Sequence, residues 1–196
     1  MMETLQAIEA SAFSMFVKES STLYTATLAF HTIGLAFLVG ISVATSFRIL
    51  GVARSLPLAP MEDFFPLMYV GFWINALTGV VLLSLYPTDY LTDGTMYIKL
   101  GAIAAAIATL RTLRAHVFGG GVGLGTEAGA RRARRLASAL LFVWLVAIVA
   151  GRVTAYTLPT KLQTAAAVLV FGAVVLSIGY GAARGLGWIG SSQQGA

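Results

Sequence analysis

The sequence predicts an all-α membrane protein, in which a bundle of five transmembrane helices follows an interfacial amphipathic helix. Of the 196 residues, 58% are hydrophobic and only 11% are charged, whereas about 25% of the residues of a soluble domain are charged. The mean hydropathy is +0.83. Five long apolar segments follow one another along the chain, and about 20 such residues suffice for a helix to cross a bilayer. These observations exclude a soluble globular domain and a disordered chain.

The residue types also exclude several kinds of site. The chain contains no cysteine, which rules out structural disulfides, cysteine-type zinc sites, iron–sulfur clusters and catalytic thiols. Paired carboxylates with the spacing of an acid–base hydrolase are missing, and no Ser–His–Asp arrangement can be recognised. We therefore do not expect this chain to be an enzyme on its own.

Residues 1–23 precede the first apolar segment and have the pattern of an amphipathic surface helix. Apolar residues recur at helical spacing from Leu5 to Val17, and charged residues such as Glu9 and Lys18 lie between them. Such a helix lies in the plane of the membrane interface. It is not expected to be a cleavable signal peptide, because it lacks a basic start and an uninterrupted apolar run.

The five spans are expected at about residues 24–47, 64–86, 96–118, 136–158 and 162–184. Each must be helical, because lipid offers no hydrogen-bonding partner to backbone N–H and C=O groups. The third span is the weakest, since Lys99 and Arg111 bound its apolar centre, and Lys99 and Arg114 must extend toward the interfaces. Together the spans form one bundle over residues 24–184, followed by a cytoplasmic tail at residues 185–196.

The distribution of Lys and Arg predicts the orientation of the bundle. Nine of the 13 Lys and Arg residues lie on one side, after the first, third and fifth spans. Because cytoplasmic loops carry the excess of basic residues, we expect the N-terminus outside and the C-terminus in the cytoplasm.

A run of arginines, Arg131–Arg135, has the composition of a nucleic-acid or anionic-lipid patch. It immediately precedes a span, however, and this is where a topology signal is expected. We therefore expect the lipid bilayer, and not nucleic acid, as a partner of the chain.

Five polar or charged side chains are expected at a similar depth in the outer half of the bundle: His31, Asn75, Thr78, Lys99 and Arg152. His31 lies seven residues into the first span, and Arg152 lies seven residues before a proline. At the rise of an α-helix, each is then about 10 Å below the outer surface. Thr78 is about 12 Å deep by the same count, and Lys99 lies slightly above it.

This cluster carries positive charge and no carboxylate, so it suits an anionic or carbonyl-bearing ligand. A quinone oxygen, a haem propionate, a lipid phosphate, or Asp89 and Asp93 from the outer loop could each fill that role. A charged group at this depth normally faces a partner or a wet cavity. His31 could also bind a metal ion or a haem iron, or only form a hydrogen bond between helices.

A haem held by two histidines is not expected. The second histidine, His116, lies twenty residues into the third span, about 30 Å below the outer surface. Two axial ligands of one iron must meet at one depth, and His31 and His116 do not.

Residues 31–40 (HTIGLAFLVG) and 47–51 (FRILG) carry a family resemblance that continues through Thr78-Gly79 and residues 97–100. Over about residues 15–118, the chain resembles an uncharacterised family of bacterial inner-membrane proteins with a domain of unknown function. It is more distantly similar to membrane proteins of the copper-resistance D type, which also have histidine in their spans. The asparagine that the family typically has late in its third span is missing from residues 106–110. The resemblance implies a bacterial inner-membrane location and no established activity.

Taken together, these features predict a non-catalytic membrane subunit that binds a redox-type ligand, a quinone or a haem, in the outer half of the bundle. Other subunits of a larger redox assembly are its expected partners. One alternative is a purely structural or assembly subunit, whose polar groups pair with one another. Another is the handling of copper or another metal, with His31 near Met15, Met96, Asp89 and Asp93 at an outer entry.

Overall fold

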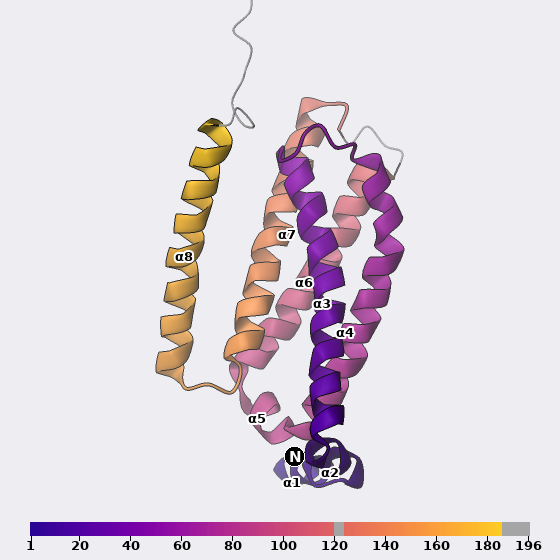
Figure 1. The fold of residues 1–196 in the computed structure, drawn as a ribbon, viewed down its shortest axis with the longest axis vertical. Helices are drawn as coiled ribbons and strands as arrows, with labels where there is room; N and C mark the ends of the chain where they lie inside the picture. Colours follow the sequence, from indigo (N-terminus) through magenta and orange to yellow (C-terminus); the bar gives the residue numbers. More distant parts are fainter. Residues whose placement is uncertain (120–123, 186–196) are drawn as a thin grey trace, which may run out of the picture.

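The computed structural model describes residues 1–119 and 124–185 (Figure 1). Within these ranges every regular element is a helix, and five helices are long and apolar enough to cross a membrane. They are α3 (Ser21–Leu50), α4 (Phe65–Leu85), α6 (Gly94–Phe118), α7 (Glu127–Val153) and α8 (Leu158–Gly185). The predicted class, an all-α multi-pass membrane protein, is confirmed. Residues 186–196 of the predicted tail lie outside the described residues.

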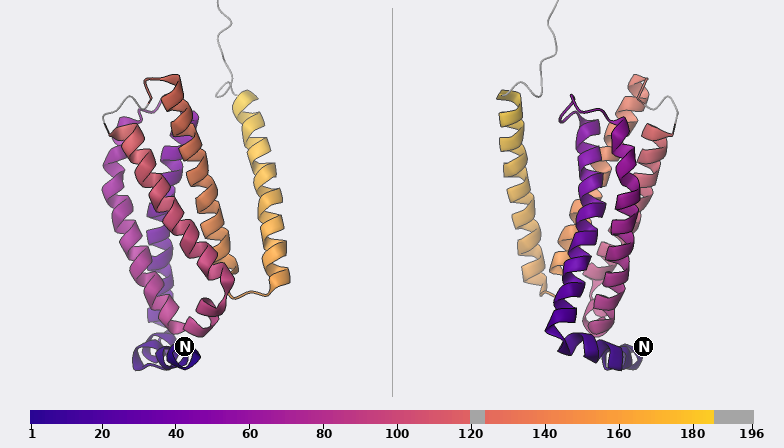
Figure 2. Two further views of the ribbon diagram at one scale, coloured as in Figure 1. Left: turned by 180° about the vertical axis from the view of Figure 1, so that it is seen from behind. Right: turned by 45° about the vertical axis from the view of Figure 1, so that its right-hand side comes forward.

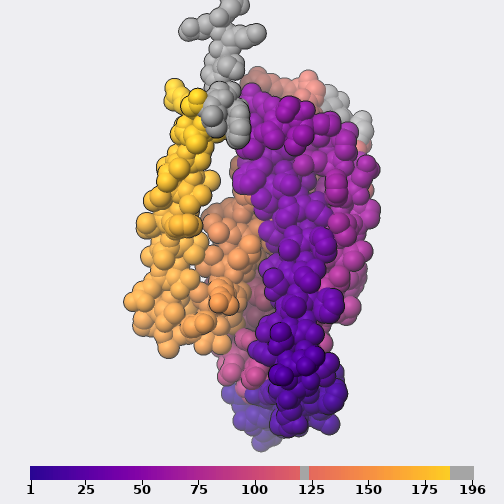
Figure 3. Space-filling view, in the orientation of Figure 1, coloured from indigo at the N-terminus to yellow at the C-terminus, as the bar shows by residue number. Residues whose placement is uncertain are grey.

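Four of the long helices form a bundle, and α8 stands beside it (Figures 1 and 2). α3 packs closely against α4 and α7, and α6 packs closely against α7, whereas α4 and α6 meet only weakly. The bundle is therefore tight on three sides and loose on the α4/α6 side. No residue of α8 is buried, and open space separates its far end from the bundle (Figure 3).

The N-terminal segment forms two short helices, α1 (Met2–Glu9) and α2 (Ala12–Glu19), where the sequence suggested one. The break follows from Ser11, whose side chain accepts a hydrogen bond of 3.2 Å from the backbone N–H of Ser14. This is the N-cap arrangement that starts a new helix. Both helices lie across the end of the bundle at which α3 begins, beside the short helix α5 (Pro87–Thr92) (Figure 1).

The ends of α7 differ most from the expected spans. The helix begins at Glu127 and not near residue 136, because the side chain of Thr126 caps it by accepting from Gly129 N–H at 3.1 Å. The arginine run therefore lies within the first turns of the helix. α7 ends at Val153 and not near residue 158, since Ala155 has a φ of 67°, a left-handed conformation that an α-helix cannot contain.

The buried core lies where α3, α6 and α7 meet the first half of α4. Trp144 of α7 is its largest member, at 1% exposed. Around it pack Leu38, Phe65, Met68, Ala106, Leu110, Leu113 and Leu140. The 3₁₀ helix η1 (Ala59–Phe64) directly precedes α4, at the end of the bundle where α4 begins.

Two glycines set the distance between α3 and α4. A Cβ on Gly34 would lie 2.7 Å from the backbone oxygen of Gly71 and 2.6 Å from the backbone nitrogen of Asn75. A Cβ on Gly71 would lie 2.8 Å from the backbone oxygen of Gly34. The two backbones are thus in direct contact, as small residues allow between membrane helices. This contact places Asn75 within reach of His31.

Candidate functional site

The imidazole of His31 joins α3 to α4. Its Nδ1 lies 3.0 Å from the backbone oxygen of Asn75 and 3.1 Å from the hydroxyl of Thr78. The side-chain amide of Asn75 donates in return to the backbone oxygen of His31 at 2.8 Å. Because a carbonyl oxygen can only accept, Nδ1 carries the proton, and Nε2 of the neutral ring is left as an acceptor. Three of the predicted site residues therefore form one interhelical network.

Lys99, a fourth predicted residue, reaches the same region from α6. Its side chain passes Gly151 of α7, where a Cβ would lie only 3.2 Å from the Cδ of Lys99. Lys99 is partly buried, and no carboxylate of the described residues forms an ion pair with it. A lysine in a membrane-spanning helix is costly unless a ligand, water or counter-charge faces it.

The side chains of His31, Asn75 and Lys99 line a cleft of about 250 Å³ on the loose α4/α6 side of the bundle. The two walls are formed by Phe72, Asn75, Ala76, Gly79, Val80 and Leu83 of α4 and by Met96, Lys99, Leu100 and Ile103 of α6. His31 and Leu38 of α3 and Trp144 of α7 complete the lining. Apolar walls with a few polar groups are typical of small-ligand sites. Thr78 is not among the residues that line the cleft, although its hydroxyl lies 3.1 Å from His31 Nδ1.

Trp144 is the residue of this cleft that the sequence did not reveal. Its indole Nε1 is buried and has no hydrogen-bond partner among the described residues. Buried Trp N–H groups usually find a partner, so an unpaired N–H in a residue that lines the cleft is unusual. A tryptophan within an apolar run such as LLFVWLVAIV carries no polar signal, and only the packing shows that its N–H group is unpartnered.

Arg152 is not among the residues that line the cleft, contrary to expectation. It lies in the last turn of α7 and its side chain is exposed. The predicted depth of about 10 Å assumed a helix that continues to Pro159, but residues 154–157 form the connection to α8. The error is therefore one of helix length, and the positive charge of the cleft comes from Lys99.

Asp93 is bound outside the cleft and does not fold toward it. Both of its carboxylate oxygens lie 2.6 Å from Lys161 Nζ, and they accept further bonds from the backbone N–H groups of Thr95 and Ala155. The Lys161 ammonium group holds the pKa of the Asp93 carboxyl far below its usual range. Asp93 thus ties the start of α6 to the α7–α8 connection.

His116 lies apart from His31, near the other end of the bundle. Its Nε2 is 3.0 Å from the backbone oxygen of Gly129, at the start of α7. Within residues 1–119 and 124–185, no three His, Asp or Glu side chains are grouped so that they could hold a metal ion. His31 and Met96 line the same cleft, so of the residues considered for metal handling only these two are brought together there.

The cleft is therefore lined by apolar walls together with three residues that carry N–H or ring-nitrogen groups, His31, Lys99 and Trp144. The family resemblance of the sequence stays a prediction. No protein-family model, curated protein or solved structure matches this chain.

Proposed function

We propose that this chain is a non-catalytic subunit of a membrane redox assembly and that it binds the ring of a quinone in the α4/α6 cleft. One observation carries the proposal. Lys99 forms no ion pair and Trp144 Nε1 no hydrogen bond with a described residue, and both residues line one apolar cleft.

The donors and the acceptor suit the two redox forms of a quinone. A quinone has two carbonyl oxygens that accept, which matches the ammonium group of Lys99 and the indole N–H of Trp144. A quinol has two hydroxyl groups that also donate, and Nε2 of His31 can accept one of them. The hydrogen bonds from His31 Nδ1 to α4 fix the orientation of the ring, so the acceptor position is preorganised.

The size of the cleft favours a quinone ring over a haem. Pockets for drug-sized ligands measure roughly 300–1,000 Å³, and this cleft of about 250 Å³ is slightly smaller. A single six-membered ring with its two oxygens is compatible with that volume, whereas the haem macrocycle is several times larger than such a ring. An isoprenoid tail would leave the cleft sideways, into the lipid.

The location that we propose is the bacterial inner membrane, with the N-terminus outside. The five long apolar helices support a membrane, and the nine Lys and Arg residues on one side support the orientation. Larger partner subunits are part of the same proposal.

The experiment is to purify the protein in a mild detergent, extract it with organic solvent and quantify quinone by chromatography. We expect bound quinone near one per chain and a marked loss in Lys99→Met. A visible absorption spectrum of the same sample shows whether the protein also binds haem. A protein without quinone, which also fails to bind added decylubiquinone, would instead support the purely structural subunit.

A further inference from the structure

The loose α4/α6 side continues from the cleft toward the arginine-rich end of the bundle. A second, apolar hollow of about 130 Å³ lies there, lined by Leu38, Met68, Phe72, Trp73, Ile107 and Leu110 together with Tyr69 and Arg111. A third, of about 330 Å³, is lined by Glu62, Tyr69, Arg111, Arg114 and Phe118. Tyr69 and Arg111 belong to both, so the two hollows adjoin.

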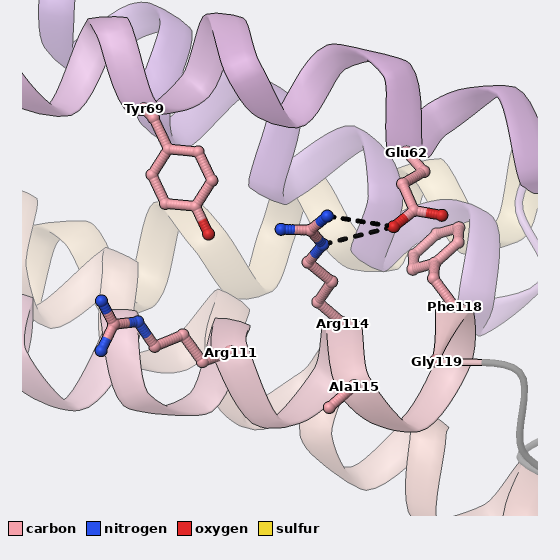
Figure 4. A pocket seen from close by; sticks show the side chains of 7 residues that line it. All are labelled: Glu62, Tyr69, Arg111, Arg114, Ala115, Phe118 and Gly119. Carbon is pink, nitrogen blue, oxygen red and sulfur yellow. Dashed lines mark hydrogen bonds and ion pairs between the residues drawn. The ribbon is translucent and has the colours of Figure 1, made fainter.

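The two arginines at this end differ in their pairing. Arg114 bonds to Glu62 through Nε at 3.3 Å and Nη2 at 3.2 Å, and its guanidinium lies over the ring of Phe65. Arg111 makes no ion pair with a described residue. Figure 4 shows the Tyr69 hydroxyl pointing into the space between the two arginine side chains. A phenol donor and a guanidinium without a counter-charge therefore face one opening.

We propose that the phosphate of an anionic phospholipid binds Arg111 and Tyr69 at this opening, while a segment of one acyl chain lies in the apolar hollow between α4 and α6. A guanidinium binds phosphate oxygens through two parallel N–H donors. Arg132 of α7 borders a neighbouring hollow with Arg111 and adds positive charge for the headgroup. This site lies outside the proposed quinone cleft, with which it shares only Leu38 and Phe72.

The apolar hollow favours a lipid over a free phosphate. Arg111 lines both the polar opening and the hollow that leads away from it, into the membrane. Along that path the lining side chains are large and apolar, with Phe72 from α4 and Ile107 from α6 among them. A soluble phosphate would leave these walls uncovered, whereas an acyl chain covers them.

Native mass spectrometry of the full chain in neutral detergent, titrated with phosphatidylglycerol, tests this proposal. We expect Arg111→Gln to weaken retention about tenfold, since a hydrogen bond to a charged group is lost. Ile107→Trp, which fills the hollow without changing charge, should weaken it as well. The matched control is Arg134→Gln, which removes the same charge from an exposed position of α7 that does not line these hollows.

Three outcomes overturn the proposal: equal losses in Arg111→Gln and Arg134→Gln, equal retention of phosphatidylcholine, or displacement by glycerol 3-phosphate at the same concentration as the lipid. The first would indicate diffuse surface charge, and the last a free-phosphate site. Circular dichroism of each variant verifies folding, and Arg111→Lys, which keeps the charge, should recover part of the retention. Quinone content in Arg111→Gln is expected to be unchanged, which separates this result from the test of the proposed function.

Discussion

At the scale of single residues, His31 shows how a polar ring is accommodated inside a membrane helix. Its Nδ1 donates to the backbone of Asn75, and the amide of Asn75 donates back to the backbone of His31. Each helix thereby satisfies a polar side chain of the other, which lipid could not do. Interhelical hydrogen bonds of this kind contribute about 1 kcal/mol.

We therefore expect Asn75→Leu to lower the free energy of unfolding by about 1 kcal/mol, because it removes one interhelical bond at nearly constant volume. Denaturant unfolding in detergent micelles measures this. Thr32→Val is the control, since the Thr32 hydroxyl is exposed and bonds only within its own helix, to the backbone oxygen of Leu28. Equal effects of the two substitutions would show that the network does not stabilise the bundle.

The sequence predicted which of these residues lie near one another better than it predicted their packing. Depth counted along the helices placed His31, Asn75, Thr78 and Lys99 together, and the structure brings them together. The placement of Arg152 in the cleft depended on where α7 ends. The left-handed conformation of Ala155 ends α7 earlier than the sequence predicted. Trp144 could not be predicted, since only the packed structure shows that its N–H group has no partner.

At the scale of elements, the contact between α3 and α4 positions the cleft. Gly34 and Gly71 let the two backbones touch, and a Cβ at either position would lie within 3 Å of the facing backbone. Gly71, Asn75 and Thr78 recur at helical spacing in the sequence and so share a small, polar face of α4. The close contact of that face with Gly34 could not be read from one helix alone.

Gly71→Ala should therefore destabilise the protein by about 1–3 kcal/mol through overpacking. It should also weaken quinone binding, because separating the helices moves Asn75 away from His31. Gly101→Ala is the control: a Cβ there meets no atom within 4 Å. Unfolding in detergent and quinone content of the same two variants are the measurements, and a stable Gly71→Ala protein would contradict the tight contact.

A second interaction between elements, the ion pair of Asp93 and Lys161, depends on pH. Lys161 holds the pKa of Asp93 below its usual range in the folded protein, so this ion pair stabilises the fold fully above the pKa of a free Asp carboxyl, about 4. The stabilisation is lost as the pH falls below that value. We expect the difference in unfolding free energy between wild type and Asp93→Asn to be largest near pH 7 and to shrink toward pH 3. The matched control is Asp89→Asn, which removes a carboxyl that forms no ion pair in the described structure.

At the scale of the whole molecule, charge and apolar surface are arranged along the bundle axis. The capping helices α1 and α2 lie at one end, and the arginine run of α7 lies at the other (Figure 1). α8 is linked to the bundle through the α7–α8 connection and the Asp93–Lys161 pair, while its sides are exposed. Sequence hydropathy predicted five spans correctly, because a membrane helix needs only length and apolar composition. It could not show that α8 would stand apart.

The proposed orientation can be tested directly, because the chain has no native cysteine. Glu3 and Ser55 are exposed at opposite ends of the bundle. In intact bacteria, a membrane-impermeant maleimide should label Glu3→Cys, and it should label Ser55→Cys only after permeabilisation. The reverse pattern would place the arginine-rich end outside.

We propose above all that the cleft between α4 and α6 binds a quinone beside Trp144 and Lys99. The most direct measurement is the dissociation constant of decylubiquinone for wild type, Trp144→Phe and the control Trp73→Phe, whose exposed ring lies outside the cleft. Trp144→Phe keeps an aromatic ring and removes only the fused pyrrole ring with its N–H, so we predict weakening by about three- to tenfold. Trp73→Phe should bind like wild type. Equal affinities of all three proteins, or no saturable binding by any of them, would contradict the account.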